Sequence, residues 1–281
     1  MKVMLILIVL LPFAIGFGLF MKSSVLLKEQ NLGGILFSSN WRPMAKSFGF
    51  LPFIVSSFYV TILSLVIAGP ICIFTAIYLT QYASERFLRI MRPLIDILAG
   101  IPSVIYGVWG ILIIVPLISK HIGPLMGTQT SGYTILAASL VLAIMIIPFI
   151  LNITIEVFRT IPIELTEAAL SLGTTRWETI KHVLMRKGFA GIVSALGLGV
   201  SRAFGETIAV LMVAGNFTKM PKGLLQPGYP LPALIANNYG EMLSIPQYDS
   251  ALMFAALVLF IVVILFNLAS RITIARLELA N

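Results

Sequence analysis

Six stretches of the chain are apolar for about 20 residues or more, and no other feature restricts the possible folds so strongly. The hydrocarbon core of a bilayer is about 30 Å thick, and an α-helix needs about 20 apolar residues to cross it. A helix also satisfies its own backbone hydrogen bonds in lipid, where no water is available. We therefore predict six transmembrane helices. They lie near residues 3–21, 52–80, 93–118, 133–158, 189–215 and 248–270.

The composition excludes soluble, disordered and nucleic-acid-binding proteins. Hydrophobic residues make up 59% of the chain and charged residues 11%, against roughly 45–50% and about 25% in soluble domains. A chain this apolar cannot stay solvated as a disordered polymer. Its formal net charge of +8 is therefore expected to face anionic lipid headgroups rather than nucleic acid.

No metal site, disulfide framework or catalytic site is expected. The one cysteine, Cys72, lies inside an apolar run, and the two histidines, His121 and His182, are far apart in the sequence. Such residues cannot assemble a Cys/His metal site or a set of disulfides. The chain also lacks a G-x-x-x-x-G-K-[ST] nucleotide loop, an H-E-x-x-H motif and a Ser/His/Asp or Cys/His set. We therefore expect that the chain is not an enzyme.

The first apolar run begins after Lys2 and is expected to remain as an uncleaved signal anchor. The segment Phe17–Lys22 (FGLFMK) offers no A-x-A-like cleavage site. The run also exceeds the 7–15 residues of a typical signal-peptide core. A cleaved signal peptide is the alternative that these features disfavour.

The distribution of Lys and Arg predicts the orientation in the membrane. Six spans place both termini on the same side. The termini, the second loop and the fourth loop together carry eleven basic residues, and the other three loops carry seven. Because cytoplasmic loops are enriched in Lys and Arg, we predict that both termini are cytoplasmic.

Residues 159–188 are the one sizeable segment predicted to project into the cytoplasm, and they are expected to form a helix, a sharp turn and a second helix. Pro162 suits the first turn of a helix, and Gly173 supplies the left-handed residue that ends it. The second helix begins with Thr175 as its N-cap and Glu178 completing a capping box. These signals fit a rigid knob projecting from the membrane or an amphipathic helix lying on lipid.

Within this loop the sequence resembles the EAA loop of ABC importer permeases. Glu167-Ala168-Ala169, three residues and Gly173 match the EAA---G pattern of that family. The family's closing proline is replaced by Arg186, so the second helix is free to run on. The resemblance implies that the loop docks into a groove on the ATP-hydrolysing subunit. The implied coupling residues are Glu167, Ala168, Ala169, Gly173, Arg176 and Trp177.

Four longer strings narrow the resemblance to the phosphate-specific transport permeases, and to their PstC type more than their PstA type. They are AGIPSVIYGVWG (99–110), GYTILAASLVLAIMIIPFI (132–150), SRAFGETIAVLMVAGN (201–216) and PGYPLPALIAN (227–237). The resemblance implies an all-α, polytopic membrane helix bundle with the type I ABC importer (MetI-like) permease fold. It divides the chain into an N-terminal transmembrane helix with an extracytoplasmic loop (1–51) and an ABC transmembrane type-1 permease domain (52–275).

The same resemblance implies a transport function and a set of partners. It places the chain in the cytoplasmic (inner) membrane as a permease subunit that moves inorganic phosphate into the cell. The implied partners are a PstA-type permease in a heterodimer, two copies of a PstB-type ATPase and an extracytoplasmic PstS-type phosphate-binding protein. ATP and Mg²⁺ are then bound by the ATPase, and this chain holds no cofactor.

The fifth predicted span carries a stripe of small residues and two charges. Small residues at every fourth position predict close approach of another helix. They are Gly191, Ala195, Gly199 and Ala203. Arg202 and Glu206, four residues apart, are expected to share a face of the same helix. Each charge at a helix centre costs about 2.5–3.5 kcal/mol on the insertion scale.

Two interpretations of Arg202 and Glu206 are open on the residues alone. In the structural one, Arg202 binds a carbonyl or an acid on a neighbouring helix, and Glu206 neutralises it. In the functional one, both face the translocation path, where the Arg202 fork holds phosphate by two parallel hydrogen bonds. The family resemblance favours the functional interpretation, because the matching residues of PstC-type permeases are regarded as needed for transport.

Three alternative functions follow from the same features. Molybdate- and sulfate-type permeases share the loop and the fold, and differ only in the longer strings. An ion-coupled secondary transporter would use Arg202 and Glu206 as a relay, but leaves the loop at 159–188 without a role. A membrane-embedded enzyme is disfavoured because Glu206 is the one acid deep in a span. Asp96 and Glu156 lie nearer cytoplasmic ends, where they are either solvated or paired with Arg92 and Arg159.

Overall fold

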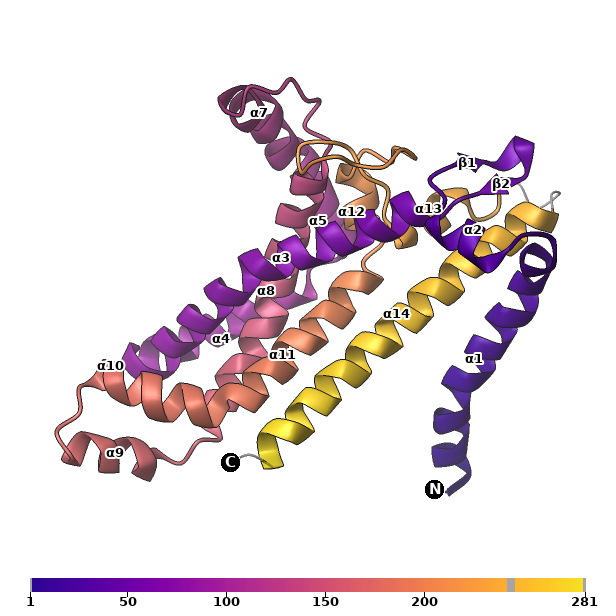
Figure 1. The fold of residues 1–281 in the computed structure, drawn as a ribbon. Helices are drawn as coiled ribbons and strands as arrows, with labels where there is room; N and C mark the ends of the chain where they lie inside the picture. Colours follow the sequence, from indigo (N-terminus) through magenta and orange to yellow (C-terminus); the bar gives the residue numbers. More distant parts are fainter. Residues whose placement is uncertain (1, 242–245, 280–281) are drawn as a thin grey trace.

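The structure of the chain is a computed structural model that describes residues 2–241 and 246–279. Within these residues, six helical segments are long and apolar enough to cross a membrane. They are Ile6–Glu29, Leu51–Tyr82, Ser103–Leu125, Ile135–Arg159, Arg176–Gly205 and Gln247–Thr273. The predicted all-α class and the predicted number of spans are therefore confirmed, and Figure 1 shows the long helices running obliquely through an elongated bundle.

Helices α3 (Leu51–Ile77), α8 (Ile135–Arg159) and α11 (Met185–Gly205) form the centre of the bundle. In the most apolar stretch of α8, 67% of the residues are buried, against 6% in the N-terminal span. Glycines let α11 approach α8 closely, since a Cβ at Gly199 would lie 2.6 Å from Ile150 Cδ1 and one at Gly191 would overlap Val157. The predicted stripe of small residues is thus confirmed as a packing face.

Helix α1 (Lys2–Glu29) packs against α14 (Pro246–Leu279) at one end of the bundle. Ser250 joins the two helices, because its Oγ donates to the Lys22 carbonyl at 2.9 Å and accepts from the Leu26 N–H at 3.0 Å. Nearer the middle of α1, Gly16 lies against Phe260. Most other side chains of α1 are exposed and apolar, as expected for a helix that faces lipid.

The third predicted span, 93–118, is wrong at its beginning. The structure ends α4 (Glu85–Gly100) at Gly100 and starts the span at Ser103. Pro102 causes the break, because proline lacks an N–H and disfavours helical backbone at the residue before it. Helix α4 is a separate amphipathic helix, with the Ser84 hydroxyl accepting from the Phe87 N–H at its N-cap.

The span itself, from Ser103 to Leu125, is a chain of short helical segments. It alternates between α-helical and wider π-helical turns. The segments are α5 (Ser103–Trp109), η3 (Gly110–Ile114), α6 (Val115–Leu117), η4 (Ile118–Ile122) and α7 (Gly123–Leu125). A π-helical turn inserts one extra residue into the helical repeat, so the apolar pattern does not keep one face.

The fifth predicted span, 189–215, is wrong at both ends. The helix starts at Arg176 and runs without interruption to Gly205 as α10 (Arg176–Thr179), η5 (Ile180–Leu184) and α11. Arg186 occupies the position where the family pattern has a proline, so the helix continues through it, as the sequence allows. Beyond Gly205 the backbone becomes extended at Glu206 (φ −72°, ψ 125°), and a separate short helix, α12 (Ile208–Val213), follows.

Aromatic residues build a second core at the opposite end of the bundle from α9 (Ile163–Ser171). Around it lie α2 (Leu32–Phe37), β1 (Trp41–Arg42), η1 (Pro43–Ala45), β2 (Ser47–Phe48) and α13 (Leu231–Asn238). The antiparallel strands pair Trp41 with Phe48, and the Trp41 ring centroid lies 5.0 Å from that of Phe53 in an edge-on arrangement. The loop after the first span is therefore packed onto the helix bundle.

Tyr229 connects α13 and α3 within this second core. Its hydroxyl accepts from the Asn237 and Asn238 side-chain amides at 2.9 and 2.8 Å. Burial raises the pKa of this hydroxyl, and the two amide donors act in the opposite direction. The Tyr229 ring also stacks edge-on against Phe53, with 5.5 Å between the centroids. Tyr229 thus remains a neutral, fixed anchor at neutral pH.

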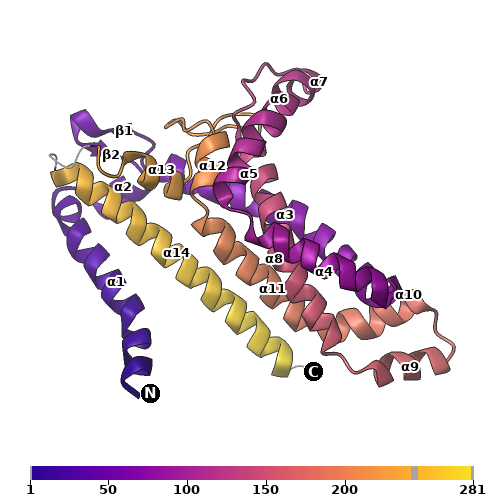
Figure 2. The same ribbon diagram turned by 180° about the vertical axis from the view of Figure 1, so that it is seen from behind.

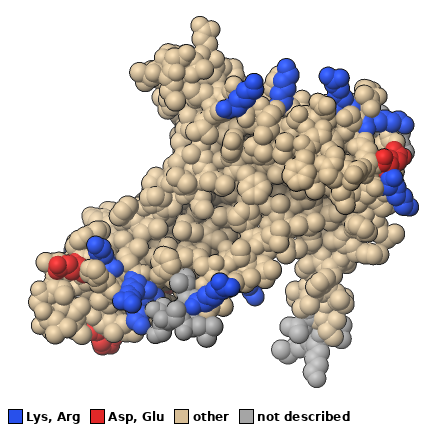
Figure 3. Space-filling view, in the orientation of Figure 1, with Lys and Arg blue, Asp and Glu red and all other residues tan. Residues whose placement is uncertain are grey.

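The ends of the helices divide between two sides of the molecule. Figures 1 and 2 show the start of α1, the end of α14 and the helix α9 on one side, and β1, β2 and α7 on the other. In Figure 3, Lys and Arg gather in two bands at these opposite edges, with a broad uncharged belt between them. This distribution suits a protein whose middle lies in hydrocarbon.

Candidate functional site

The turn of the loop at 159–188 is built as the sequence predicts. Helix α9 follows Pro162 and ends at Ser171, and Gly173 then adopts φ +82°. The Gly173 N–H donates to the Leu170 carbonyl at 2.9 Å, and the Thr174 hydroxyl donates to the Ala169 carbonyl at 2.8 Å. These bonds satisfy the Ala169 and Leu170 carbonyls near the end of α9, and the chain reverses sharply at Gly173.

The second helix of the loop also begins as predicted. The Thr175 hydroxyl accepts from the Glu178 N–H at 3.3 Å, and the Glu178 carboxylate accepts from the Thr175 N–H at 2.8 Å. This reciprocal capping box fixes the direction in which the helix leaves the turn. This second helix continues into the membrane span, as the replacement of the family's closing proline by Arg186 allows.

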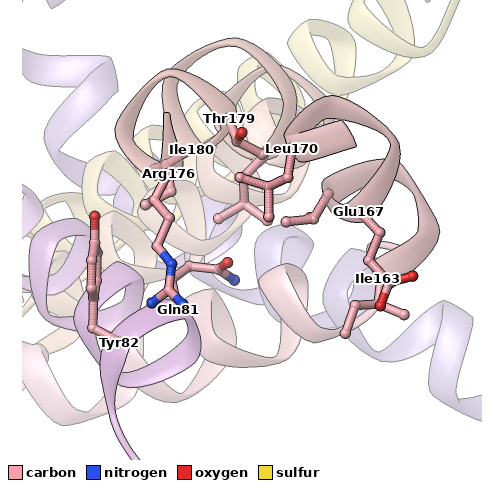
Figure 4. Close-up of a pocket in the computed structure, with 10 residues that line it drawn as sticks. Gln81, Tyr82, Ile163, Glu167, Leu170, Arg176, Thr179 and Ile180 are labelled. Atoms are coloured by element: carbon pink, nitrogen blue, oxygen red, sulfur yellow. The ribbon is translucent and has the colours of Figure 1, made fainter. Parts of the chain in front are cut away.

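A pocket of about 260 Å³ separates the two helices of the loop (Figure 4). Arg176 and Gln81 lie on one side of the view and Glu167 on the other. Gln81 belongs to η2 (Tyr78–Tyr82), the end of the second span. The pocket therefore lies between the loop and the end of the second span.

The six predicted coupling residues do not converge on one spot. Glu167 and Arg176 line the pocket between the helices. Trp177, 53% exposed, lies instead at a separate apolar cavity of about 430 Å³ with Phe74 and Lys181. Ala168 and Gly173 are exposed on the outside of the turn, and Ala169 is half-buried. The loop thus presents a surface rather than a closed site.

Arg202 lies in the last turn of α11, and its guanidinium carbon is 5.2 Å from the ring centroid of Phe149 on α8. Such an arrangement over an aromatic face is a cation–π contact. Across the described residues, the one salt bridge joins Arg92 to Glu156. Arg202 is exposed on the surface of the isolated chain.

The expected helical pairing of Arg202 with Glu206 is wrong. The helix ends at Gly205, so the two residues do not share a helix face. The Glu206 carboxylate instead accepts from the Ala209 N–H at 3.1 Å and caps α12. Glycine, a poor helix former, ends α11, and the exposed N–H groups of α12 provide a better partner for the carboxylate than Arg202 does.

Two polar links between α4 and α8 were not predicted as such. Arg92 Nη2 lies 2.9 Å from Glu156 Oε1, and Asn152 Nδ2 donates to Asp96 Oδ1 at 2.9 Å. Glu156 thus pairs with Arg92, and Asp96 binds an amide rather than an arginine. The sequence does carry a signal for these links. Arg92 and Asp96 are four residues apart on α4, and Asn152 and Glu156 are four residues apart on α8, so each helix presents two polar residues on one face.

A polar contact between α11 and α14 was also missed. Ser201 Oγ donates to Asn267 Oδ1 at 3.0 Å, directly beside Arg202 in the sequence. Asn267 is a single polar residue in a long apolar run, and this isolation is the sequence signal for a polar contact with a neighbouring helix.

Comparison with known proteins identifies the family. Residues 71–279 match the family described as binding-protein-dependent transport system inner membrane component. The chain belongs to this family. It is a multi-pass permease subunit of an ABC importer, and a permease of this kind is not itself an enzyme. Membership in the family disfavours the ion-coupled transporter and the membrane-embedded enzyme.

Individual relatives place the permease more closely. It is 38% identical over 256 residues to a protein of Xylella fastidiosa named phosphate transport system permease protein PstC, covering 86% of this chain and 78% of that protein. A protein of the same name from Pasteurella multocida is 38% identical over 257 residues, covering 86% and 80%. The resemblance to PstC-type permeases is thereby confirmed.

A solved structure confirms the fold. The inward-facing MetNI methionine ABC transporter contains a chain that superposes on this permease with a TM-score of 0.59 at 18% sequence identity. The match covers 85% of this chain and 99% of that chain. The permease therefore has the MetI-like fold of type I ABC importers.

Proposed function

We propose that this permease imports inorganic phosphate across the cytoplasmic membrane. The observation that carries the proposal is the 38% identity to permeases named for phosphate transport, over 86% of the chain. The matched region includes the strings around Arg202 that separate phosphate permeases from other oxyanion permeases. A molybdate or sulfate permease is the alternative, and these relatives do not favour it.

The chemistry of Arg202 supports an anionic substrate. A guanidinium offers two parallel N–H donors that match two oxygens of a phosphate. Within the described residues, no carboxylate lies within salt-bridge distance of Arg202, so its charge is not already neutralised. The cation–π contact with the Phe149 ring uses none of the N–H donors of the guanidinium in a hydrogen bond.

Glu206 complements this role from the next segment. One carboxylate oxygen caps α12 through the Ala209 N–H. The other oxygen is available to accept a hydrogen bond from the protonated oxygen of hydrogen phosphate, a donor that fully ionised oxyanions lack. Its negative charge also weakens anion binding near Arg202, so that the phosphate is released rather than trapped.

The loop at 159–188 is proposed to transmit ATP hydrolysis mechanically. Its rigid turn at Gly173 and its continuous second helix connect the exposed residues Glu167 and Ala168 to the span that carries Arg202. Closure of two ATPase subunits against α9 would then move α11 as a lever. The proposed assembly contains a PstA-type permease, a PstB-type ATPase dimer that binds ATP and Mg²⁺, and a PstS-type binding protein. Both termini and α9 face the cytoplasm.

Purification in mild detergent tests this assembly and its substrate. The tagged permease should co-purify with an ATPase and a second permease, identified by mass spectrometry. The complex, reconstituted into vesicles with its binding protein, should take up radiolabelled phosphate on addition of ATP. Excess unlabelled phosphate should compete, whereas sulfate and molybdate should not. Uptake of sulfate or molybdate in preference to phosphate would refute the proposed substrate.

A further inference from the structure

Helices α11 and α14 are joined by a side-chain hydrogen bond in the apolar part of the bundle. Ser201 Oγ donates to Asn267 Oδ1 at 3.0 Å, and the Asn267 amide donates to the Val263 carbonyl of its own helix at 2.9 Å. Both residues are half-buried. The amide thus has partners on both sides, one of them supplied by the neighbouring helix.

The helices also touch closely one turn away. A Cβ at Gly197 would overlap the Ser270 hydroxyl, so the absence of a side chain there brings α14 against α11. Gly197 precedes Ser201 by one turn, and Ser270 follows Asn267 by about one turn, as antiparallel helices require. The contacts of Gly197 and Ser201 lie one above the other along α11, so together they fix both the distance between α11 and α14 and the rotation of α11 about its axis.

Aromatic residues hold the same turn of α11 from another direction. The Phe204 ring centroid lies 5.1 Å from that of Phe266 on α14 and 5.3 Å from that of Phe58 on α3. Phe266 is the neighbour of Asn267 in the sequence. The last turn of α11 therefore has defined contacts with α14 and α3.

Rotation of this turn would break the hydrogen bond and leave the Asn267 carbonyl oxygen without its interhelical partner. In hydrocarbon no water replaces the lost donor. Arg202 follows Ser201 by one residue, about 100° around the helix axis. Holding Ser201 toward α14 therefore directs Arg202 toward α8, where its guanidinium meets Phe149 at 5.2 Å.

We propose that Asn267 is a positioning residue that sets the direction of Arg202. The inference rests on the proposed function, in which Arg202 binds the transported phosphate. Asn267 does not touch the substrate. It acts through Ser201, by fixing the rotation of the helical turn that carries the guanidinium.

Two readouts test the positioning role in the reconstituted complex. The first is phosphate uptake by two variants. Asn267→Leu removes the hydrogen bond and places an apolar side chain in the apolar part of the bundle. Ser201→Ala removes the same hydrogen bond by deleting the hydroxyl on α11. Each is expected to reduce uptake at least fivefold while the complex still assembles. The double variant should lose no more than either single variant, because both remove the same bond. Thr273→Val is the matched control on α14, since the Thr273 hydroxyl bonds only within its own helix among the described residues, and its uptake should stay within twofold of the unaltered complex.

The second readout is the reactivity of a thiol introduced by Arg202→Cys toward a negatively charged methanethiosulfonate. The native Cys72 is buried and provides the unreactive background, measured on the unaltered chain. Adding Asn267→Leu should change the modification rate at least fivefold, and adding Thr273→Val should not change it.

The outcomes separate the two proposals. If Arg202→Lys transports phosphate normally, the proposed function of Arg202 fails whatever Asn267 does. If Arg202→Lys loses transport but Asn267→Leu alters neither uptake nor the modification rate, the positioning role is overturned. Loss of uptake without a change of modification rate, or the reverse, also overturns it. Should Asn267→Leu fail to assemble, the same two readouts on Ser201→Ala decide.

Discussion

The Arg202 guanidinium carbon lies 5.2 Å from the ring centroid of Phe149, on a different helix and far away in the sequence. The expected partner, Glu206, caps α12 instead. A charge held by an aromatic face keeps its N–H donors free for an anion. In the proposed function, this arrangement rather than an ion pair binds the phosphate.

Gly173→Val is expected to uncouple ATP hydrolysis from uptake. At φ +82° a β-branched side chain costs about 1–2 kcal/mol, although the space around Gly173 is open. The cost is therefore one of backbone conformation, which the chain relieves by splaying the two helices. ATPase co-purification and the ratio of phosphate transported to ATP hydrolysed measure the effect.

Gly173→Asn is the matched control, because asparagine tolerates left-handed backbone, and it should couple nearly normally. Glu167→Arg should weaken ATPase association without changing the turn. Full coupling in Gly173→Val would show that the shape of the turn does not matter.

Gly199→Val should destabilise the bundle. A Cβ at Gly199 would come within 2.6 Å of Ile150, at a close contact of α8 and α11, and overpacking typically costs about 1–3 kcal/mol. The thermal midpoint in detergent should fall. Gly18→Val provides the control, because nothing lies within 4 Å of a Cβ at that position. Equal midpoints for the two variants would contradict the packing described here.

The orientation is testable with fused reporters. A reporter active only outside the cytoplasm should work after Lys222 and fail after Arg89, Lys181 or Arg276, because the start of α1 and the end of α14 lie on the same side as α9. Activity after Lys181 would place the loop outside and remove it from any ATPase.

Glu206→Gln is expected to reduce phosphate uptake while leaving the fold intact. Glutamine keeps an oxygen that accepts from the Ala209 N–H, so the cap on α12 survives and only the charge is lost. Glu206→Leu removes the cap as well. If Glu206→Gln transports normally and Glu206→Leu does not assemble, the residue serves only as a cap.

Local signals in the sequence were enough to predict the turn of the loop. Gly173, Thr175 and Glu178 act on neighbouring backbone groups, so their roles follow from spacing alone. The third and fifth spans were misplaced because hydropathy does not register a helix break: Pro102 and Gly205 end helices inside apolar surroundings. The pairing of Asn267 with Ser201 depends on the crossing of two helices, which no local pattern specifies.

Phosphate uptake by Arg202→Lys in the complete, reconstituted complex tests the central claim most directly. Lysine keeps the positive charge but loses the planar fork of two donors. We expect uptake to fall at least tenfold, about 1.4 kcal/mol, while the complex assembles and its ATPase remains active, and Arg202→Gln should also assemble. Normal transport by Arg202→Lys, together with failure of Arg202→Gln to assemble, would show that Arg202 is structural and that phosphate is bound elsewhere.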